Sequence, residues 1–348
     1  MFYTEVPLSD VADAYTGKQL NKSAMSNDGL YAVINGGVEA SGYTNNYNEE
    51  ENTITISQGG ASAGFVNWNS KKIWIGAHCY AIHPKDRDID NRFLYFVLKE
   101  KQEELMQSKQ GAGIPGINRT TINKLLIPLP HIKVQEEIVK ILDYFTNLID
   151  ALNEELSLRQ KQFEYYREKL LTFDDSECEW KKLSDVAEIG TGSGNTNEGL
   201  NKGLYPFFTR GQEKLWKNDY EFDEEAVITA GDGVGVGKVM HYIKGKYSLH
   251  QRAYRFKPQK ILVTKFLYHY MKVTFYNYVC ENSVSSSVSS LRKPKLMVYP
   301  IPIPPLAIQQ TIVEKLDAFE SLISSLKEEI ALRQKQYEYY REKLLTFE

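Results

Sequence analysis

A long internal repeat is the strongest constraint on what this chain can fold into. The stretch EELSLRQKQFEYYREKLLTF at residues 154–173 returns as EEIALRQKQYEYYREKLLTF at residues 328–347, displaced by 174 positions. When the comparison starts at Ile127 and Ile301, 29 of 47 aligned positions are identical. Self-similarity over such a length is typical of a duplicated architectural unit. The fold must therefore contain this unit twice.

The spacing of apolar residues predicts that both copies form long helices. Apolar or aromatic residues alternate in steps of four and three, which is the heptad pattern of a coiled coil. The pattern occupies Ile138, Leu142, Phe145, Ile149, Leu152, Leu156, Phe163, Tyr166 and Leu170, and then Ile312, Leu316, Phe319, Ile323, Leu326, Ile330, Tyr337, Tyr340 and Leu344. A helix of roughly 37 residues would be about 55 Å long and could not bury this stripe alone. We therefore expect the two copies to pair with each other.

The order of segments along the chain favours an antiparallel pair. Each helix follows a block of about 125 residues, and an antiparallel pair places one block at each end, with an approximate two-fold axis. A parallel pair would instead need a connection that crosses the whole rod. The predicted segments are a first globular domain at 1–127, a first helix at 128–175, a second globular domain at 176–300 and a second helix at 301–348.

One position of each helical stripe holds an arginine, Arg159 in the first copy and Arg333 in the second. A solvated or locally paired arginine at such a position would fix the register of the coiled coil. In the alternative interpretation, the aliphatic stem covers apolar surface while the guanidinium group contacts a partner. We assign both residues to coiled-coil register and neither to catalysis.

The two globular blocks share their opening residues and a mixture of strands and helices. The sequence LSDVA occurs at 8–12 and again at 183–187, so the whole chain is a tandem duplication. Short β-branched runs between turns predict strands, for example at Thr53–Ser57, Ile73–Ile75 and Val227–Thr229. Segments 92–107 and 263–279 have helical spacing, and clustered prolines predict an extended lead into each long helix. The expected fold class is α+β: two globular domains separated by two long antiparallel coiled-coil helices, with pseudo-two-fold symmetry.

Composition places the chain among intracellular globular proteins. With 348 residues, of which 42% are hydrophobic, it is long enough for two cored domains. The three cysteines, Cys79, Cys178 and Cys280, lack CxxC or metal-binding spacing, which suits a reducing compartment. Apolar runs stay well below ~18 residues, and the opening MFYTEVPLSD lacks a basic and then apolar signal. We therefore expect a cytoplasmic protein without a membrane partner.

The net charge of the whole chain, −3, argues against a nucleic-acid partner, but the charge is unevenly distributed between the regions of the sequence. Residues 1–127 carry 12 Lys and Arg against 14 Asp and Glu, whereas residues 176–300 carry 18 against 13. The second block therefore has a net charge of +5, which allows a DNA-binding face there. The first block gains no such support from its charge.

Motifs of catalysis are missing from the sequence. The segment GDGVGVGK at 231–238 resembles a phosphate-binding loop, but it has Asp232 where that motif needs Gly and Val239 where it needs Ser or Thr. We interpret it as a glycine-rich turn, with a contact of Lys238 or the backbone to DNA phosphate as the alternative. The six histidines show no HExxH or other metal spacing, and neither a GxSxG elbow nor an NPPY-type methylation tetrapeptide occurs. We therefore expect no catalytic residue and no metal site.

The chain does offer side chains that can bind DNA. Arginine can bind guanine through two hydrogen bonds in the major groove, and glutamine can bind adenine in the same way. The candidate DNA-binding residues are Asn35, Gln58, Ser62, Asn67, Lys71, Lys72 and Arg119 in the first block, and Thr209, Arg210, Lys238, Gln251 and Arg252 in the second. Each residue by itself is more often an ordinary surface or turn residue. The hypothesis therefore depends on the duplicated architecture.

Over essentially its full length, the chain resembles the specificity (S) subunits of type I restriction-modification systems. The resemblance lies in the openings LSDVA and LSDVAEIGTG, in the duplicated long helix, and in the phrases IPLPHIKVQEEIVKILD and IPIPPLAIQQTIVEKLD, which contain Gln135 and Gln309. It implies that each variable block is a target recognition domain that reads one half of a split double-stranded DNA sequence, and that the helices act as a ruler. Because the blocks have diverged, we expect an asymmetric target with half-sites about one turn, ~34 Å, apart.

The resemblance also implies partners. Two modification (methyltransferase) subunits would dock on the helices and methylate adenine with AdoMet, and restriction subunits that consume ATP would join them to cleave DNA. AdoMet, ATP and Mg would then bind the partner subunits, and this chain would bind no cofactor. Two alternatives stay open: a specificity subunit of a type II-like fused nuclease and methyltransferase, or a non-DNA scaffold protein, which the negative first block favours.

Overall fold

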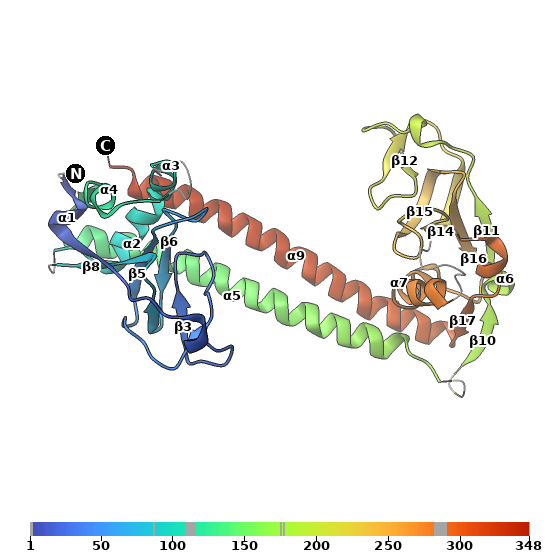
Figure 1. Ribbon diagram of the computed structural model, residues 1–348. Coiled ribbons are helices and arrows are strands. Elements are labelled where there is room, and N and C mark those ends of the chain that lie inside the picture. Colours follow the sequence, from blue (N-terminus) through green and yellow to red (C-terminus); the bar gives the residue numbers. More distant parts are fainter. Residues whose placement is uncertain are drawn as a thin grey trace. The chain divides into compact units, whose positions relative to one another are not determined.

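The computed structural model describes residues 3–85, 88–108, 116–174, 176, 178–281 and 291–347. The chain divides into two compact units, Met1–Asn153 with Glu329–Glu348, and Glu154–Glu328. Each unit therefore contains one globular block together with part of each long helix (Figure 1).

The first unit is built around a four-stranded antiparallel sheet in the order β2-β8-β5-β6 and a three-stranded sheet in the order β4-β3-β7. Its elements are β1 (Thr4–Pro7), α1 (Leu8–Val11), β2 (Ala12–Thr16), η1 (Lys22–Ala24), β3 (Tyr31–Ile34), β4 (Tyr43–Thr44), β5 (Thr53–Ser57), β6 (Val66–Asn69), β7 (Ile73–Ile75), β8 (Cys79–Pro84), α2 (Asn91–Glu100), α3 (Gln102–Gln107), α4 (Arg119–Asn123) and β9 (Leu126–Leu129). The strands predicted at Thr53–Ser57 and Ile73–Ile75 are confirmed with the same bounds.

The second unit is built around a six-stranded sheet in the order β11-β16-β14-β15-β12-β13, and α7 packs against β14 and β15. Its elements are β10 (Glu179–Lys182), α6 (Leu183–Val186), β11 (Ala187–Thr191), η2 (Thr196–Glu198), β12 (Tyr205–Phe208), β13 (Leu215–Lys217), β14 (Phe222–Ala230), β15 (Met240–Leu249), β16 (Ala253–Pro258), α7 (Thr264–Glu281), α8 (Lys293–Met297) and β17 (Pro300–Ile303). The predicted strand at Val227–Thr229 lies inside β14, and the predicted helix at 263–279 corresponds to α7.

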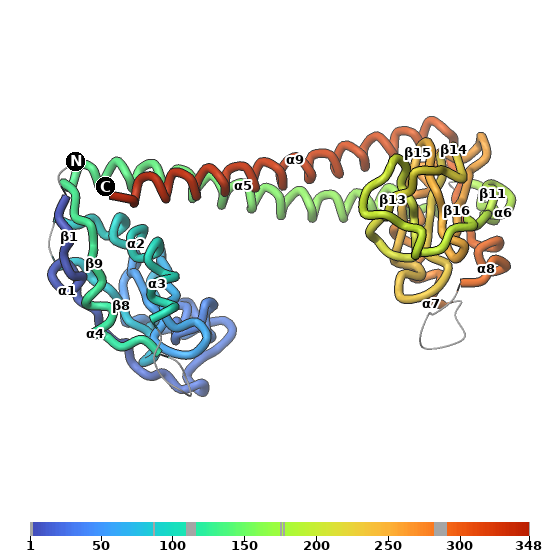
Figure 2. Tube along the Cα trace, turned by 90° about the horizontal axis from the view of Figure 1, so that it is seen from above, coloured from blue at the N-terminus to red at the C-terminus, as the bar shows by residue number. Residues whose placement is uncertain are grey.

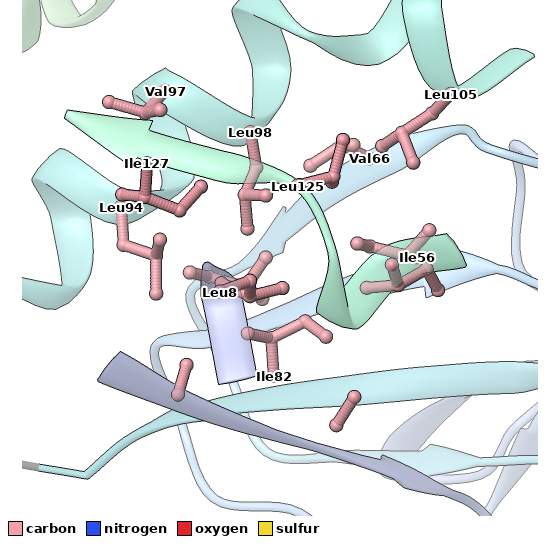
Figure 3. Close-up of a cluster of buried hydrophobic side chains, with 14 of the residues drawn as sticks. Leu8, Ile56, Val66, Ile82, Leu94, Val97, Leu98, Leu105, Leu125 and Ile127 are labelled. Atoms are coloured by element: carbon pink, nitrogen blue, oxygen red, sulfur yellow. The ribbon is translucent and has the colours of Figure 1, made fainter. Parts of the chain in front are cut away.

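The core of the first unit lies between α2 and the four-stranded sheet. Leu94, Val97 and Leu98 of α2 are buried together with residues of β5, β6 and β8, and Figure 3 shows Leu94 and Leu98 extending toward Leu8 and Ile82. The Asp90 side chain caps the helix by accepting a hydrogen bond from the Phe93 N–H at 2.8 Å. The apolar face at helical spacing therefore explains why this segment folds as a helix on the sheet.

The single helix expected over 92–107 is wrong, because α2 and α3 are separated at Lys101. The reason lies on the neighbouring strand. The Val66 N–H of β6 donates to Gln102 Oε1 at 3.0 Å, and Lys99 Nζ donates to the Val66 carbonyl at 2.8 Å. These side chains bind the backbone of Val66 at the edge of the sheet, and the helix is interrupted at Lys101, between them.

Both long helices are close to the roughly 37 residues expected from the apolar stripe and lie within the predicted segments 128–175 and 301–348. They are α5 (Ile132–Leu171) and α9 (Leu306–Leu345), each of 40 residues. In the first unit the Phe145 and Tyr340 rings stack at 5.3 Å, and in the second unit Tyr166 and Phe319 stack at 5.6 Å. In each unit the beginning of one helix thus lies beside the end of the other, which confirms the antiparallel pair (Figure 2). Within the described part of the chain, no helix has both the length and the apolarity to cross a membrane.

The proline-rich leads into the long helices are extended, as predicted. In the first unit β9 pairs antiparallel with β1, and in the second unit β17 pairs in the same way with β10. The Leu8 N–H donates to the Leu125 carbonyl, and the Leu183 N–H donates to the Tyr299 carbonyl, both at 2.8 Å. The sequence LSDVA therefore begins the same local structure in both units.

A buried glutamine joins each long helix to the globular block that precedes it. Gln135 Nε2 donates to the carbonyls of Pro130 and Asp88, while its Oε1 accepts from the Asp90 N–H. In the second unit, Gln309 makes the corresponding three bonds, to the Pro304 and Ile261 carbonyls and from the Val263 N–H, at 2.8–3.0 Å. Both glutamines are fully buried. Each one therefore holds the first turn of a long helix against the residues that directly precede α2 or α7.

Replacing Gln309 with alanine should lower the free energy of unfolding by about 2–3 kcal/mol, because three partly buried backbone groups would lose their partner. The exposed neighbour Gln310 provides a matched control, since Gln310→Ala removes the same side chain at the surface of the same helix. Urea denaturation followed by circular dichroism measures both variants. Equal midpoints for the two proteins would contradict the role assigned to Gln309.

Candidate nucleic-acid interface

Three loops of the second unit meet at one end of the six-stranded sheet. They are residues 209–211 after β12, residues 231–239 between β14 and β15, and residues 250–252 between β15 and β16. The His250 N–H donates to the Phe208 carbonyl at 2.9 Å, and the Gly231 N–H donates to the Arg252 carbonyl at 2.8 Å. We call this end of the sheet the loop edge of the second unit. It brings together four of the predicted residues, Thr209, Arg210, Gln251 and Arg252.

An aspartate lies at the centre of this edge, between two of the predicted arginines. Arg210 NH1 lies 3.1 Å from Asp232 Oδ1, and Arg252 NH1 lies 2.9 Å from Asp232 Oδ2. Partial burial opposes the charge of the carboxylate, but the hydrogen bonds from Arg252 and Arg210 hold the pKa of Asp232 below its ordinary value. We call Arg210, Asp232 and Arg252 the arginine fork. The fork carries a net charge of +1 at neutral pH.

The other predicted residues of the second unit have different surroundings. Thr209 is buried and its Oγ1 accepts from the Gly211 N–H at 3.4 Å, so it supports the loop. Gln251 is exposed and donates to Asn195 Oδ1. Lys238 is also exposed, with its ammonium group 5.3 Å from the centre of the Tyr276 ring. Gln251 is therefore available at the loop edge, whereas Lys238 lies at the far end of the glycine-rich loop.

Sequence reasoning assigned no role to two residues of this edge. In the sequence Asp232 is only a mismatch to a phosphate-binding loop, because Arg210 and Arg252 lie about twenty residues away on either side. His250 matches no metal-binding motif, so the sequence does not single it out. Its Nδ1 accepts from the Arg252 N–H at 2.9 Å, so it shapes the turn that carries Arg252.

The first unit has a corresponding loop edge with different side chains. The His78 N–H donates to Asn35 Oδ1 at 3.4 Å, and the Gln58 N–H donates to the His78 carbonyl at 2.9 Å. Gln58 Nε2 also donates to the Tyr80 hydroxyl at 3.0 Å. Ser62 lies in the loop that follows Gln58, and the exposed Arg119 begins α4. The structure thus links Asn35 and Gln58 through His78, a residue that sequence reasoning missed.

The remaining candidates of the first unit do not join this edge. Lys72 Nζ contacts Glu50 at 2.7 Å and the Tyr47 hydroxyl at 3.1 Å, and these hydrogen bonds, with Glu50 the larger cause, raise the pKa of Lys72. Asn67 lies within β6 and donates to Asn69 at 3.4 Å, while Lys71 is exposed in the following turn. Asn69 pairs with Thr53 at the opposite end of β5 from Gln58. Lys71 and Lys72, which follow Asn69, therefore lie away from the loop edge, whereas Asn67 pairs with Thr55 in the middle of β5.

The two loop edges share one backbone framework. In the first unit the Gly76 N–H donates to the Ile34 carbonyl, and the corresponding bond of the second unit runs from the His250 N–H to the Phe208 carbonyl. Likewise, the bond from the Gln58 N–H to the His78 carbonyl corresponds to the bond from the Gly231 N–H to the Arg252 carbonyl. The Tyr80 and Tyr254 hydroxyls donate to the carbonyls of Ile117 and Leu291 at 3.3 and 3.2 Å, respectively. Residues at matching positions can therefore be compared directly: Gly36 with Arg210, Gly59 with Asp232, and His78 with Arg252.

A cluster with potential metal ligands lies elsewhere in the second unit, where α7 packs on α9. His269, Asp317 and Glu320 have ligand atoms within 4.8 Å of one another. Lys265 Nζ binds the Asp317 carboxylate, and Lys272 Nζ lies 3.2 Å from Glu320. Ammonium groups thus neutralise both carboxylates. We interpret the cluster as an ion-pair network that fastens α7 to α9.

The two stripe arginines pair along their own helices. Arg159 Nε donates to Glu155 at 2.9 Å and its NH1 donates to Gln162 at 2.9 Å. Arg333 makes the same bonds with Glu329 and Gln336, each at 2.8 Å. Their assignment to coiled-coil register stays a prediction, because these bonds lie within one helix.

Comparisons with known proteins agree with this architecture. A model of the family described as "Type I restriction modification DNA specificity domain" matches residues 3–158 and 175–332. The EcoR124I/EcoR124II specificity subunit of Escherichia coli is 33% identical over 262 residues, which are 66% of this chain and 65% of that protein. The MjaVIII specificity subunit of Methanocaldococcus jannaschii is 26% identical over 318 residues, 80% of this chain and 75% of that protein.

A solved structure shows the same fold. The crystal structure of the type I restriction-modification S subunit from M. genitalium superposes with a TM-score of 0.78 at 20% identity, covering 100% of this chain and 97% of that one. The likeness shows the fold, and the family match identifies the duplicated α+β domain as a DNA specificity domain. The chain belongs to the type I restriction modification DNA specificity family, with two target recognition domains in tandem. We call the globular blocks of the first and second units the first and second domains.

The stability of the second domain should depend on pH through His250. Burial, and then the charge of Arg210, lower the pKa of His250 in the folded protein. Below the unfolded-state pKa of about 6.5, the unfolded chain takes up a proton that the folded protein does not, so stability falls as pH decreases. His250→Asn keeps a hydrogen-bond acceptor near the position of Nδ1 and removes the titrating group.

Urea denaturation of the wild type and His250→Asn at pH 7.5 and pH 5.5 measures this effect. The wild type should lose more stability between the two pH values than the variant, because the other histidines titrate in both proteins. Parallel pH profiles would show that the His250 environment does not disfavour the charged ring.

Proposed function

We propose that this chain is the non-catalytic DNA-reading subunit of a type I restriction-modification enzyme, in which each domain reads one half of a two-part target. The observation that carries the proposal is the shared framework of the two loop edges with unlike side chains on it. The second domain presents Arg210, Gln251 and Arg252, while the first presents Asn35, Gln58 and His78. An identical framework with different hydrogen-bonding groups is what two readers of different sequences require.

The chemistry of reading divides into two kinds of contact. Lysine and arginine contacts to phosphate supply affinity that falls with salt, and polar side chains at the loop edges read the base edges in the major groove. The second domain, with a net charge of +5 over 176–300, would supply more of the electrostatic affinity. The first domain would depend more on neutral hydrogen-bonding groups such as Asn35 and Gln58.

The chemical steps would belong to other chains. We infer that two modification subunits, carrying AdoMet, dock on the long helices and methylate adenine, and that restriction subunits add ATP- and Mg-dependent cleavage. The inference is supported by family membership and by the absence of methyltransferase and P-loop motifs from the sequence. The exposed charged and tyrosine side chains of the repeated EYYREK segments offer these subunits two equivalent surfaces.

Co-expression with the modification subunit of its own operon should yield one two-part methylation motif with a fixed gap of unread bases and unlike halves. Long-read sequencing of the host genome for N6-methyladenine measures this directly. A palindromic motif would contradict the predicted asymmetry. Absence of any motif, despite a stable co-purified complex, would favour the scaffold alternative over DNA reading.

Arg252→Ala should relax one half of that motif by about 1–3 kcal/mol per lost base contact and leave the other half unchanged. Lys244→Ala is the matched control, since Lys244 is an exposed cation in the middle of β15 of the same sheet, away from the loop edge. Methylation maps of the two variants in complex show the outcome. An unchanged motif in the Arg252→Ala protein would exclude Arg252 as a base reader.

A further inference from the structure

The arginine fork holds Arg252 in a defined orientation at the surface of the second domain. Its NH1 is bound to Asp232 at 2.9 Å, and its side chain is 63% exposed, against 42% for Arg210. Among the residues that the structure describes, the Nε and NH2 groups of Arg252 have no hydrogen-bond partner. The guanidinium is therefore anchored on one side and open on the other.

The glycine-rich loop accounts for the position of the anchor. A Cβ on Gly231 would lie 2.7 Å from the Arg252 carbonyl oxygen, and one on Gly235 would lie 2.4 Å from the Arg210 carbonyl oxygen. The loop backbone thus packs directly against both arginine-bearing segments. Gly233, at φ 77°, adopts a conformation that L side chains rarely take. The glycines therefore allow the close approach that puts the Asp232 carboxylate between the two guanidinium groups.

Arg210 makes this anchor compatible with DNA. A lone carboxylate at the loop edge would repel phosphates and would hold Arg252 in a neutral pair. With Arg210 on the second carboxylate oxygen, the fork keeps a net positive charge while Asp232 still fixes the orientation of Arg252. A guanidinium oriented in this way presents two adjacent donors, which match the O6 and N7 acceptors that only guanine offers side by side in the major groove.

We propose that the second domain reads a guanine through Arg252, and that Asp232 is the positioning residue that aims it. This inference rests on the proposed function and adds a base to one half-site. The first domain lacks the whole arrangement, because Gly36, Gly59 and His78 occupy the positions of Arg210, Asp232 and Arg252. The guanine contact of the fork is thus confined to one half of the target.

The methylation maps give the first test. The half-site altered by Arg252→Ala should contain a guanine at the relaxed position. A wild-type complex that produces no two-part motif would overturn the proposed function and this inference with it. A normal two-part motif in which the altered half-site has no guanine, or in which Arg252→Ala alters nothing, would overturn the guanine contact alone.

Binding of synthetic duplexes by the complex of this chain with its modification subunits tests the contact itself. Replacing the assigned guanine by 7-deazaguanine removes the N7 acceptor from the major groove and leaves base pairing intact. The wild-type complex should bind this duplex about 5- to 150-fold more weakly. The Arg252→Ala complex should bind both duplexes equally. If Arg252 contacted only phosphate, its loss would weaken both duplexes alike and the 7-deazaguanine penalty would persist.

Asp232→Asn separates positioning from folding. It keeps the size of the side chain but removes the charge that anchors Arg252, so the 7-deazaguanine penalty should shrink while the thermal midpoint stays close to that of the wild type. Asp219→Asn is the matched control, since Asp219 is a well-exposed carboxylate of the same domain outside the loop edge. An undiminished penalty in Asp232→Asn would show that Arg252 reads guanine without the anchor.

Discussion

The buried glutamines Gln135 and Gln309 are the contacts on which the rest of each unit depends. Each one makes three hydrogen bonds to backbone groups: two of these groups lie just before α2 or α7, and one lies immediately before the long helix. Because both glutamine side chains are fully buried, little water competes for these bonds. Loss of the side chain would leave three backbone groups unpaired, so the joint between domain and helix has one stable geometry. The domain bodies could diverge while this joint stayed the same.

The same division between framework and variable surface occurs at the loop edges. The Tyr80 and Tyr254 hydroxyls donate to corresponding carbonyls in the two domains, and corresponding backbone hydrogen bonds position the loops that follow the strands. The side chains that differ, such as His78 and Arg252, project from this framework and take little part in the core. A change of reading side chain would therefore cost little folding stability. This separation lets one fold present two different readers.

Much of the architecture could be predicted because it follows from periodic patterns. The heptad stripe through Ile138 and Leu142 predicts a helix wherever it occurs, and a repeat predicts the same helix twice. The strand at Thr53–Ser57 was found with its observed bounds because β-branched residues and flanking turns act locally. The prediction failed at Lys101, where the helix breaks because Lys99 and Gln102 bind the edge of β6, a strand more than thirty residues away.

The sequence by itself determined the duplication, the long helices and their antiparallel pairing, since these depend on spacing and on chain order. Only the tertiary structure decided which polar residues work together. Arg210, Asp232 and Arg252 are separated by about twenty residues at each step, and strand pairing together with the glycine-rich loop brings both guanidinium groups within 3.1 Å of one carboxylate. Lys71 and Lys72 are cationic like the two arginines, yet they lie at the opposite end of a strand pair, away from the loop edge of the first domain. The site depends on strands that pair over a long distance in the sequence. Such pairing leaves no signal in the local composition, so the sequence alone does not predict the site.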